Sequence, residues 1–377
     1  MITRVHSKKM LLPDGIREEN IYLENGKIIQ VGGTLEADEV YDFGENAVIP
    51  GLTDMHTHGA KGFDFSDTTP EGFRLATEYH LSRGATAIMP TITSLSFEST
   101  WKALECAEQA LPSCRNVVGI HLEGPYLSPE QCGAQNTAYI TAPVKEEYEK
   151  ITERFGHMIR RWDYAPERDC DNQFCKHLMS KNILPSAAHT NAIYTELKAA
   201  YDLGCKLITH LYSCTSTITR DKGFRRLGVT ECAYLLDDMY VEIITDGKHL
   251  PKELLQLIFK LKPIDRIISV SDSLSIAGAD VTSGVIGGTH YLVEDGVCKL
   301  ADRSAFAGSI VTADRILDVL LNTVEIPLEK AVCVTSENPC RFFGLQKGRI
   351  QEGYDADLVV LDQQNHVSRV ICAGKII

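Results

Sequence analysis

The sequence has no long apolar run, no excess of basic residues and no closely spaced cysteine pair of the C-x-x-C type. No stretch is long and apolar enough to span a bilayer, and residues 1–20 lack the apolar core of a signal peptide. We therefore expect a cytoplasmic protein without a membrane partner. The net charge of −13 would repel a polyanion, so nucleic acid is not an expected partner either. An anionic substrate would need a local cluster of basic side chains.

Cysteine is present but is not organised into pairs. The 12 cysteines are spread along 377 residues, which is typical of reduced, packed thiols rather than of a disulfide framework. No internal repeat of fixed period and no low-complexity tract stands out. A chain of this length usually forms one large domain and a smaller one.

Both ends of the chain have the pattern of β-structure. Residues 21–31 form two apolar runs around Asn25-Gly26, the signature of a hairpin, and the runs 357–361 and 367–377 follow near the C-terminus. A small β-sandwich domain built from both termini is the simplest arrangement. We expect it to comprise residues 1–50 and 348–377, with a catalytic domain over residues 51–347.

Between these ends, apolar runs alternate with helix-like stretches, including those over 70–83, 96–110 and 194–203. Such alternation predicts an α/β fold, a TIM-type (β/α)8 barrel. The fourth run is the weakest because Arg160, Arg161 and Asp163 interrupt it. The eight runs are 47–55, 85–92, 117–122, 158–165, 183–188, 206–211, 240–245 and 267–270.

Polar side chains that suit a metal ion close or directly follow these runs. In a parallel barrel the C-terminal strand ends converge on one mouth, so groups far apart in sequence can meet there. The pattern therefore predicts metal-assisted hydrolysis. The five potential ligands and one further carboxylate are His56, His58, Glu123, His189, His210 and Asp272.

Each of these residues also has a plainer explanation. A single histidine is usually a packed or surface residue, and Glu123 could form a salt bridge with an arginine. Asp272 could be a ligand, a helix cap or a general base, and we favour the base because the other five positions already supply coordination. His121 lies deeper in the barrel. We expect it to be hydrogen-bonded, either as a core residue or as a residue that supports the ligands from behind.

Several segments resemble the amidohydrolase superfamily and, within it, the N-acetylglucosamine-6-phosphate deacetylases. The H-x-H motif and the GYDADLV segment near the C-terminus are shared by many amidohydrolases, whereas HLEGP, HLY and DGxH look specific to the deacetylase branch. The matching segments are PGLTDMHTHG at 50–59, HLEGP at 121–125, AHTNA at 188–192, THLY at 209–212, TDGKH at 245–249, AGS at 307–309 and GYDADLV at 353–359.

The resemblance implies removal of the acetyl group from N-acetylglucosamine 6-phosphate, leaving acetate and glucosamine 6-phosphate. By position, Glu123, His189 and His210 would hold the principal divalent ion. His56 and His58 would add a second, with Glu123 bridging, although some family members use one metal. Asp272 would act as general base and then acid. Zinc or iron would be the expected ion, with manganese as a further choice, because imidazole and carboxylate ligands suit all three.

The substrate contacts that the resemblance implies depart from the family pattern at some positions. Gln135 stands where the family usually has a histidine, and Ser213, followed by Cys214, stands where it has an asparagine. Two expected substrate contacts, Arg220 and Arg225, come from a basic loop after the sixth run. The others are carried over by position, and they are Ala134, Gln135, Ser213, Cys214, Asp246, Gly247, His249, Phe306, Ala307 and Gly308.

The loop after the sixth run carries a basic cluster of Arg220, Lys222, Arg225 and Arg226. A guanidinium suits a phosphate dianion, although solvated surface charge is the plainer explanation. In the resembling family the phosphate-binding arginine comes from a neighbouring subunit, which implies a homodimer. Arg220 is the preferred candidate from its Ile218-Thr219 context.

Other functions remain open. A close variant would act on N-acetylgalactosamine 6-phosphate, which differs at one hydroxyl group. Another amidohydrolase reaction on an N-acyl compound or a cyclic amide is a second alternative. The cyclic-amide subclass often uses a carboxylated lysine from the fourth strand, and the run 158–165 has no lysine. A non-catalytic protein of the same fold is the third, and the presence of all six mouth residues argues against it.

Overall fold

A ring of parallel strands forms the centre of the computed structural model, which describes residues 1–286 and 289–377. The strands follow the order β17-β16-β13-β12-β11-β10-β9-β6, and the ring closes where His58 N donates to Ser273 O at 2.7 Å. The predicted TIM-type barrel is therefore confirmed. Its strands are β6 (Leu52–Thr57), β9 (Ala85–Ile92), β10 (Ile120–Glu123), β11 (Ile159–Tyr164), β12 (Leu184–Ala187), β13 (Leu207–Ile208), β16 (Tyr240–Ile244) and β17 (Ile267–Val270).

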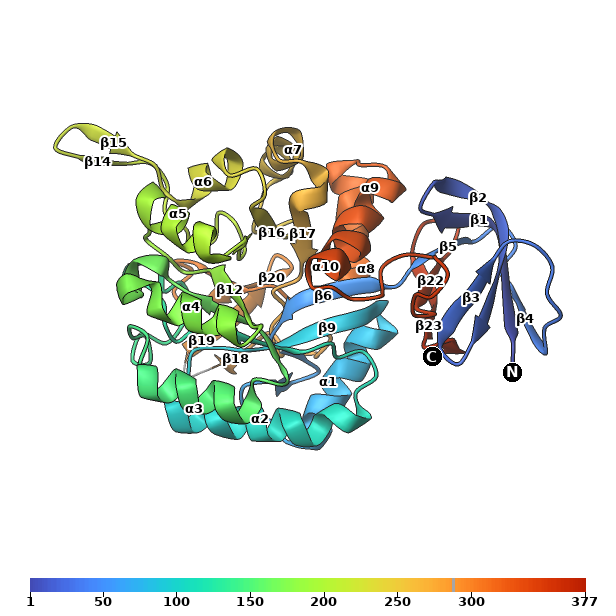
Figure 1. Cartoon of the computed structure of the whole chain (residues 1–377), viewed down its shortest axis with the longest axis horizontal. Coiled ribbons are helices and arrows are strands. Elements are labelled where there is room, and N and C mark those ends of the chain that lie inside the picture. Colours follow the sequence, from blue (N-terminus) through green and yellow to red (C-terminus); the bar gives the residue numbers. More distant parts are fainter. Residues whose placement is uncertain (287–288) are drawn as a thin grey trace.

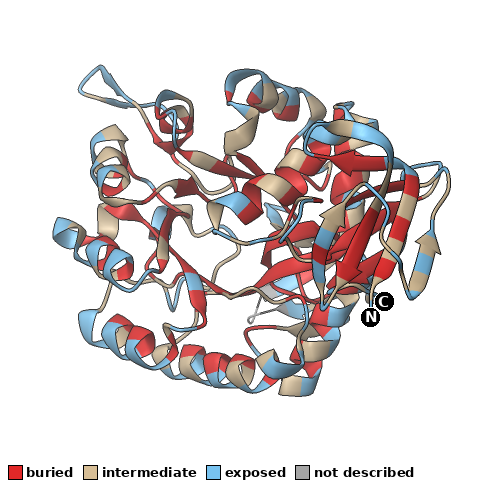
Figure 2. Cartoon of the chain, turned by 45° about the vertical axis from the view of Figure 1, so that its right-hand side comes forward, coloured by how far each residue is buried: buried red, intermediate tan, exposed pale blue. Residues whose placement is uncertain are grey.

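Helices surround this ring, with their buried faces toward the strands and their exposed faces outward (Figures 1 and 2). Two of them begin at side-chain caps, because Thr69 accepts a hydrogen bond from Gly72 N and Ser96 accepts one from Ser99 N. The helices are α1 (Pro70–Ser82), α2 (Phe97–Ala110), α3 (Lys145–Phe155), α4 (Gln173–Ser180), α5 (Tyr194–Leu203), α6 (Val229–Leu235), α7 (Lys252–Leu261), α8 (Ala313–Asp318), α9 (Leu328–Val332) and α10 (Asn338–Phe342).

Apolar packing holds the two layers together. Trp162 of β11 and Phe174 of α4 are fully buried and meet edge to face, with ring centroids 5.2 Å apart. A separate cluster from the barrel strands includes Met89, Ile244 and Val270. Such side chains fill the barrel interior, so the ring is a packed core whose mouth is free to carry function.

A second sheet, drawn from both ends of the chain, lies beside the barrel, with both termini in it (Figure 1). This confirms the predicted β domain, although its exact boundaries at residues 50 and 348 stay a prediction. The strand order is β24-β23-β22-β5-β1-β2-β3, with β4 paired to β1. The strands are β1 (Thr3–Leu12), β2 (Gly15–Glu24), β3 (Lys27–Val31), β4 (Glu39–Asp42), β5 (Ala47–Pro50), β22 (Leu358–Leu361), β23 (Val367–Cys372) and β24 (Lys375–Ile376).

The first apolar run, 47–55, differs from its prediction as one barrel strand. Its first part is β5 of the second sheet, paired with β22, and its second part belongs to β6 of the barrel. Gly51 lies between the two strands. A Cβ atom at this position would lie 2.0 Å from Thr86 Oγ1. Only glycine allows the backbone to pass so close to β9 while it changes sheets.

Three further β-structures extend from the loops in the described residues. A four-stranded sheet of β18 (Ser283–Ile286), β19 (Thr289–Glu294), β20 (Val297–Leu300) and β21 (Phe306–Gly308) follows β17. The hairpin of β14 (Thr219–Asp221) and β15 (Phe224–Arg226) projects away from the barrel (Figure 1). A two-strand pair, β7 (Gly59–Ala60) and β8 (Phe63–Asp64), follows β6. In the described residues, no helix has the length and apolarity to cross a membrane.

Candidate metal centre

The six mouth residues predicted from the sequence come together at the C-terminal ends of the barrel strands. His56 lies in β6 and Glu123 ends β10, while the others lie one or two positions beyond their strands. Their donor atoms form two adjoining groups. One comprises His56, His58 and Asp272, the other Glu123, His189 and His210, and within each group the potential ligand atoms lie within 4.8 Å of one another.

Glu123 connects the two groups. Its Oε1 atom lies 3.1 Å from Nε2 of both His189 and His210, and 3.5 Å from Nε2 of His56. Its Oε2 atom lies 3.4 Å from Nε2 of His58. The carboxylate therefore faces both groups at once, which is the position of a bridging ligand between two cations.

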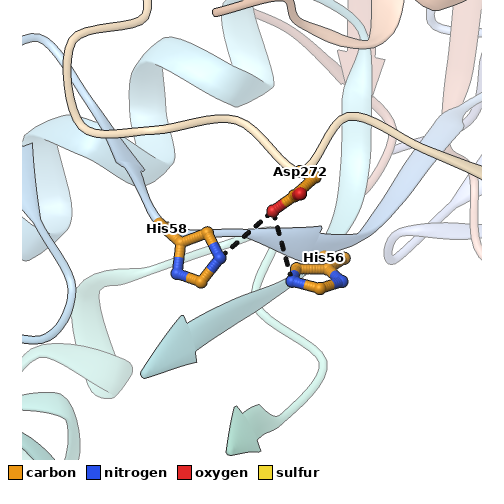
Figure 3. Close-up of side chains that lie close together, drawn as sticks. All are labelled: His56, His58 and Asp272. Carbon is orange, nitrogen blue, oxygen red and sulfur yellow. Dashed lines mark ion pairs between the residues drawn. The ribbon is translucent and has the colours of Figure 1, made fainter. Parts of the chain in front are cut away.

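Asp272 completes the first group (Figure 3). Its Oδ1 atom lies 3.4 Å from His56 Nε2 and 3.2 Å from His58 Nε2. The side chain also borders the mouth cavity, so one oxygen can face a cation while the carboxylate remains accessible to a substrate. This placement suits both a ligand and a proton acceptor.

The outer nitrogen atoms of two histidines are held by the backbone. His189 Nδ1 lies 2.8 Å from Gln131 O, and His210 Nδ1 lies 3.0 Å from Ser213 O. A carbonyl oxygen only accepts, so each Nδ1 carries a proton, and Nε2, the atom that faces Glu123, is left to bind a cation in place of a second proton. This tautomer is the one that a metal ligand needs, so the donor set fits a divalent ion of the zinc, iron or manganese kind.

Three of the six residues have a backbone conformation that side chains usually avoid. The φ angles are +41° at His189, +29° at His210 and +50° at Asp272. Positive φ is uncommon outside glycine and costs free energy, on the order of 1–3 kcal/mol for each residue. Strain of this kind concentrates at functional sites, where it directs a side chain at a strand end toward a ligand.

Burial and mutual charge set the protonation of the cluster. Burial alone would raise the pKa of Glu123, but His56, His189 and His210 hold it well below its usual range. Burial alone would lower the pKa of His56, but Asp272 and Glu123 raise it well above the usual range. Protons and a divalent ion therefore compete for the same buried nitrogen atoms, and acid is expected to weaken ion binding.

A cavity of about 320 Å³ opens above the cluster, which is the size of a small-molecule site. It brings together many residues predicted from the sequence to contact substrate: Ala134, Gln135, Ser213, Cys214, His249, Phe306, Ala307 and Gly308. His249 is oriented by Asp246, whose Oδ2 atom lies 2.7 Å from His249 Nδ1. The cavity thus combines a cation site with polar and aromatic walls.

Gln135 has a more constrained position than the sequence predicted. Its Oε1 atom accepts hydrogen bonds from Thr93 Oγ1 at 2.6 Å and Ser94 N at 3.0 Å. These two hydrogen bonds identify this atom as the oxygen of the amide. The amide nitrogen, Nε2, donates to Glu123 Oε2 at 2.6 Å. Gln135 lines the cavity, and its amide is held by hydrogen bonds to Thr93, Ser94 and Glu123.

Four of the predicted substrate contacts do not line this cavity in the described part of the chain. Asp246 contacts His249, and Gly247 is the next residue along the chain. Arg220 and Arg225 face each other as partners across the hairpin β14–β15. The hairpin extends away from the barrel (Figure 1), and neither arginine is among the described residues that line the cavity.

Sequence reasoning missed several residues around the site. Asp64 and Tyr291 line the cavity, and a buried charged group of Arg161 and Glu242 lies next to His56. A signal for Glu242 was available, because it is a lone carboxylate within the apolar run 240–245. His121 matches its prediction as a hydrogen-bonded residue, with Nδ1 3.0 Å from Thr91 Oγ1 and Nε2 3.0 Å from Asp163 Oδ2.

A barrel whose mouth gathers four imidazoles and two carboxylates around one substrate-sized cavity defines a metal-dependent hydrolase. The model of the amidohydrolase family matches residues 47–377. The chain belongs to the amidohydrolase family.

Individual relatives carry more specific names. The chain is 29% identical to N-acetylglucosamine-6-phosphate deacetylase of Lysinibacillus sphaericus, over 95% of this chain and 92% of that protein. It is 26% identical to N-acetylgalactosamine-6-phosphate deacetylase of a Shewanella species, over 95% and 91%. The crystal structure of N-acetylglucosamine-6-phosphate deacetylase from Thermotoga maritima superposes with a TM-score of 0.88 at 30% identity, covering 100% of this chain and 99% of that one.

Proposed function

We propose that this protein removes the acetyl group from N-acetylglucosamine 6-phosphate, using one or two divalent ions at the barrel mouth. The observation that carries the proposal is the position of Glu123, whose two oxygens face His189 and His210 on one side and His58 on the other. The name of the relative from Lysinibacillus sphaericus, an N-acetylglucosamine-6-phosphate deacetylase, supports the choice of substrate, because the similarity covers both chains almost entirely.

In this proposal Glu123, His189 and His210 hold the principal ion, and His56 and His58 hold a second with Asp272 beside them. When bound, such an ion polarises a carbonyl group and lowers the pKa of water that it binds. Asp272 is an ionised carboxylate, because His56 and His58 overcome the effect of burial and hold its pKa below its usual range. It takes a proton from the attacking water and then delivers it to the departing amine nitrogen.

The remainder of the cavity binds the sugar. His249 and Phe306 stand together on one wall, with ring centroids 5.0 Å apart, and can contact the ring and its hydroxyl groups. The phosphate requires a cation, and we propose that Arg220 of a second copy supplies it in a homodimer. The outward direction of the hairpin and the exposure of Phe224 at its tip support this, since both suit contact with another subunit.

Replacing Gln135 with alanine tests its part in this site. The variant loses the amide that donates to Glu123 Oε2, so we expect kcat/KM to fall roughly 10-fold or more, the range for loss of a residue behind a metal ligand. Steady-state kinetics with N-acetylglucosamine 6-phosphate give the value. Gln256→Ala, at an exposed position on α7, is the matched control and keeps full activity. Unchanged kcat/KM in Gln135→Ala would show that the hydrogen bond contributes nothing.

Acetate release from three sugars tests the substrate. We expect rapid turnover of N-acetylglucosamine 6-phosphate. Turnover of N-acetylglucosamine should be much slower, because this sugar lacks the phosphate dianion. N-acetylgalactosamine 6-phosphate is the third substrate, and it represents the second candidate function, which the Shewanella relative favours. Faster turnover of the galactosamine derivative would move the assignment to that epimer. Turnover of none of the three would overturn the proposal and direct the search to other N-acyl compounds.

A further inference from the structure

A fully buried group of charged side chains lies next to His56 inside the barrel. Arg161 and Asp163 of β11 and Glu242 of β16 each have 0% exposure. They come from strands that are not neighbours in the ring, since β12 and β13 lie between them. Buried charges are costly without partners, so the group must be held together by specific contacts.

Arg161 makes those contacts. Both terminal nitrogens donate to the Glu242 carboxylate, the Nη2–Oε2 bond being 2.9 Å long, and Nη2 also donates to Thr209 Oγ1 at 2.7 Å. Its Nε atom donates to Asp163 Oδ1 at 2.9 Å. The guanidinium therefore fixes both carboxylates. Its bidentate hydrogen bonding sets the plane and position of the Glu242 carboxylate.

The group carries an uncompensated negative charge. One guanidinium faces two carboxylates, Asp163 and Glu242, which leaves a net charge of −1. His121 Nε2 lies 3.0 Å from Asp163 Oδ2, so Glu242 is the carboxylate of the group that faces His56. A negative charge held inside the barrel favours a cation at the adjoining mouth.

Glu242 is the member that reaches the mouth residues. Its Oε2 atom lies 3.5 Å from His56 Nδ1, on the side of the imidazole away from Glu123 and Asp272. Within residues 1–286 and 289–377, neither ring nitrogen of His56 has a hydrogen-bond partner, although both are buried. His189 and His210 have backbone carbonyls at the corresponding nitrogen, so His56 alone of these three has a carboxylate in that place.

We infer that Glu242, fixed by Arg161, is a positioning residue for a cation at His56 and His58. Glu242 accepts the proton of His56 Nδ1, which turns the Nε2 lone pair toward the cation, and the negative charge of the group strengthens the attraction. The inference rests on the proposed function, because it concerns the second of the two ions that the mouth would hold. It goes beyond that function by naming the side chains that decide whether this site is filled.

Metal binding tests the inference without reference to activity. Metal-free wild type and Glu242→Gln are titrated with Zn²⁺ by calorimetry, and bound zinc is counted after dialysis. We expect wild type to bind two ions. The variant should bind one ion as tightly as wild type and the other about 10- to 100-fold more weakly, the usual effect of losing the residue behind a ligand. Asp169→Asn is the matched control and keeps both ions, since it alters a buried carboxylate that accepts hydrogen bonds from Phe174 N and Cys175 N of α4.

The alternative outcomes separate this inference from the proposed function. Two ions bound equally tightly by wild type and Glu242→Gln would overturn the inference and leave the deacetylase proposal intact. One ion in wild type would also overturn it, whereas a deacetylase with one ion would still be active. If Glu242→Gln does not fold, Glu242→Asp replaces it, since it keeps the charge beside Arg161 but withdraws the oxygen from His56. The same loss of one ion is then expected, and equal binding of two ions would again overturn the inference.

Discussion

Asp272→Asn is expected to lower kcat by about 10³-fold, because an amide cannot accept a proton from the attacking water or return it to the amine. This corresponds to about 4 kcal/mol in the activation free energy. The Asp272 carboxylate lies in contact distance of His56 and His58 and borders the cavity, so its loss affects the reaction directly. Acetate release under saturating substrate measures the effect.

The control for this variant is Asp238→Asn, whose side chain is 72% exposed. It should keep wild-type kcat, because surface ion pairs contribute little. Metal content should also be measured, since Glu123, His189 and His210 remain and the principal ion should stay bound in Asp272→Asn. A variant that retained most of its kcat would exclude Asp272 as the general base.

Glu123→Gln is expected to have the largest effect on ion binding. Glu123 Oε1 faces three imidazoles and Oε2 faces a fourth, so a neutral amide there removes the shared negative charge from both groups. We expect the affinity for both ions to fall by more than about 100-fold, beyond the effect of losing a residue behind a ligand, and activity to be lost with it. Zinc counted after dialysis gives the first value and acetate release the second.

The matched control is Glu253→Gln on the exposed face of α7, which should keep both its ions and its activity. Circular dichroism of Glu123→Gln should show the barrel intact, because the altered residue ends a strand rather than filling the core. Tight binding of two ions in Glu123→Gln would contradict the proposed bridging position.

The residues of the mouth could be predicted because each is marked by its immediate neighbours in the sequence. His189 and His210 each follow a short apolar run, and parallel strands of a barrel bring such positions to one place without knowledge of any contact. The helix-like stretches 70–83 and 96–110 and the turn at Asn25-Gly26 are equally local signals. Their elements appear where the sequence placed them.

The residues that escaped prediction depend on partners far away in the sequence. Arg161 made the fourth run look unlike a buried strand, because the partner that makes its burial tolerable, Glu242, lies 81 positions away. Tyr291 reaches the cavity from the four-stranded sheet after β17, an addition to the eight alternating units. No periodicity within a window of the sequence can report either contact.

Gln135 shows a different limit. Its contact with the substrate stays a prediction, and the structure adds that its amide is hydrogen-bonded to Thr93, Ser94 and Glu123. Those hydrogen bonds depend on a neighbouring strand end rather than on the chain near residue 135. A resemblance can thus locate a residue at the site without giving its hydrogen bonds.

The most direct measurement is acetate release from N-acetylglucosamine 6-phosphate by protein stripped of metal and by the same protein after addition of Zn²⁺, Fe²⁺ or Mn²⁺. We expect negligible release by the stripped protein and restored turnover with at least one of these ions, in proportion to the ion bound. Rapid release by fully stripped protein, or none after two ions are bound, would contradict metal-dependent deacetylation of this substrate.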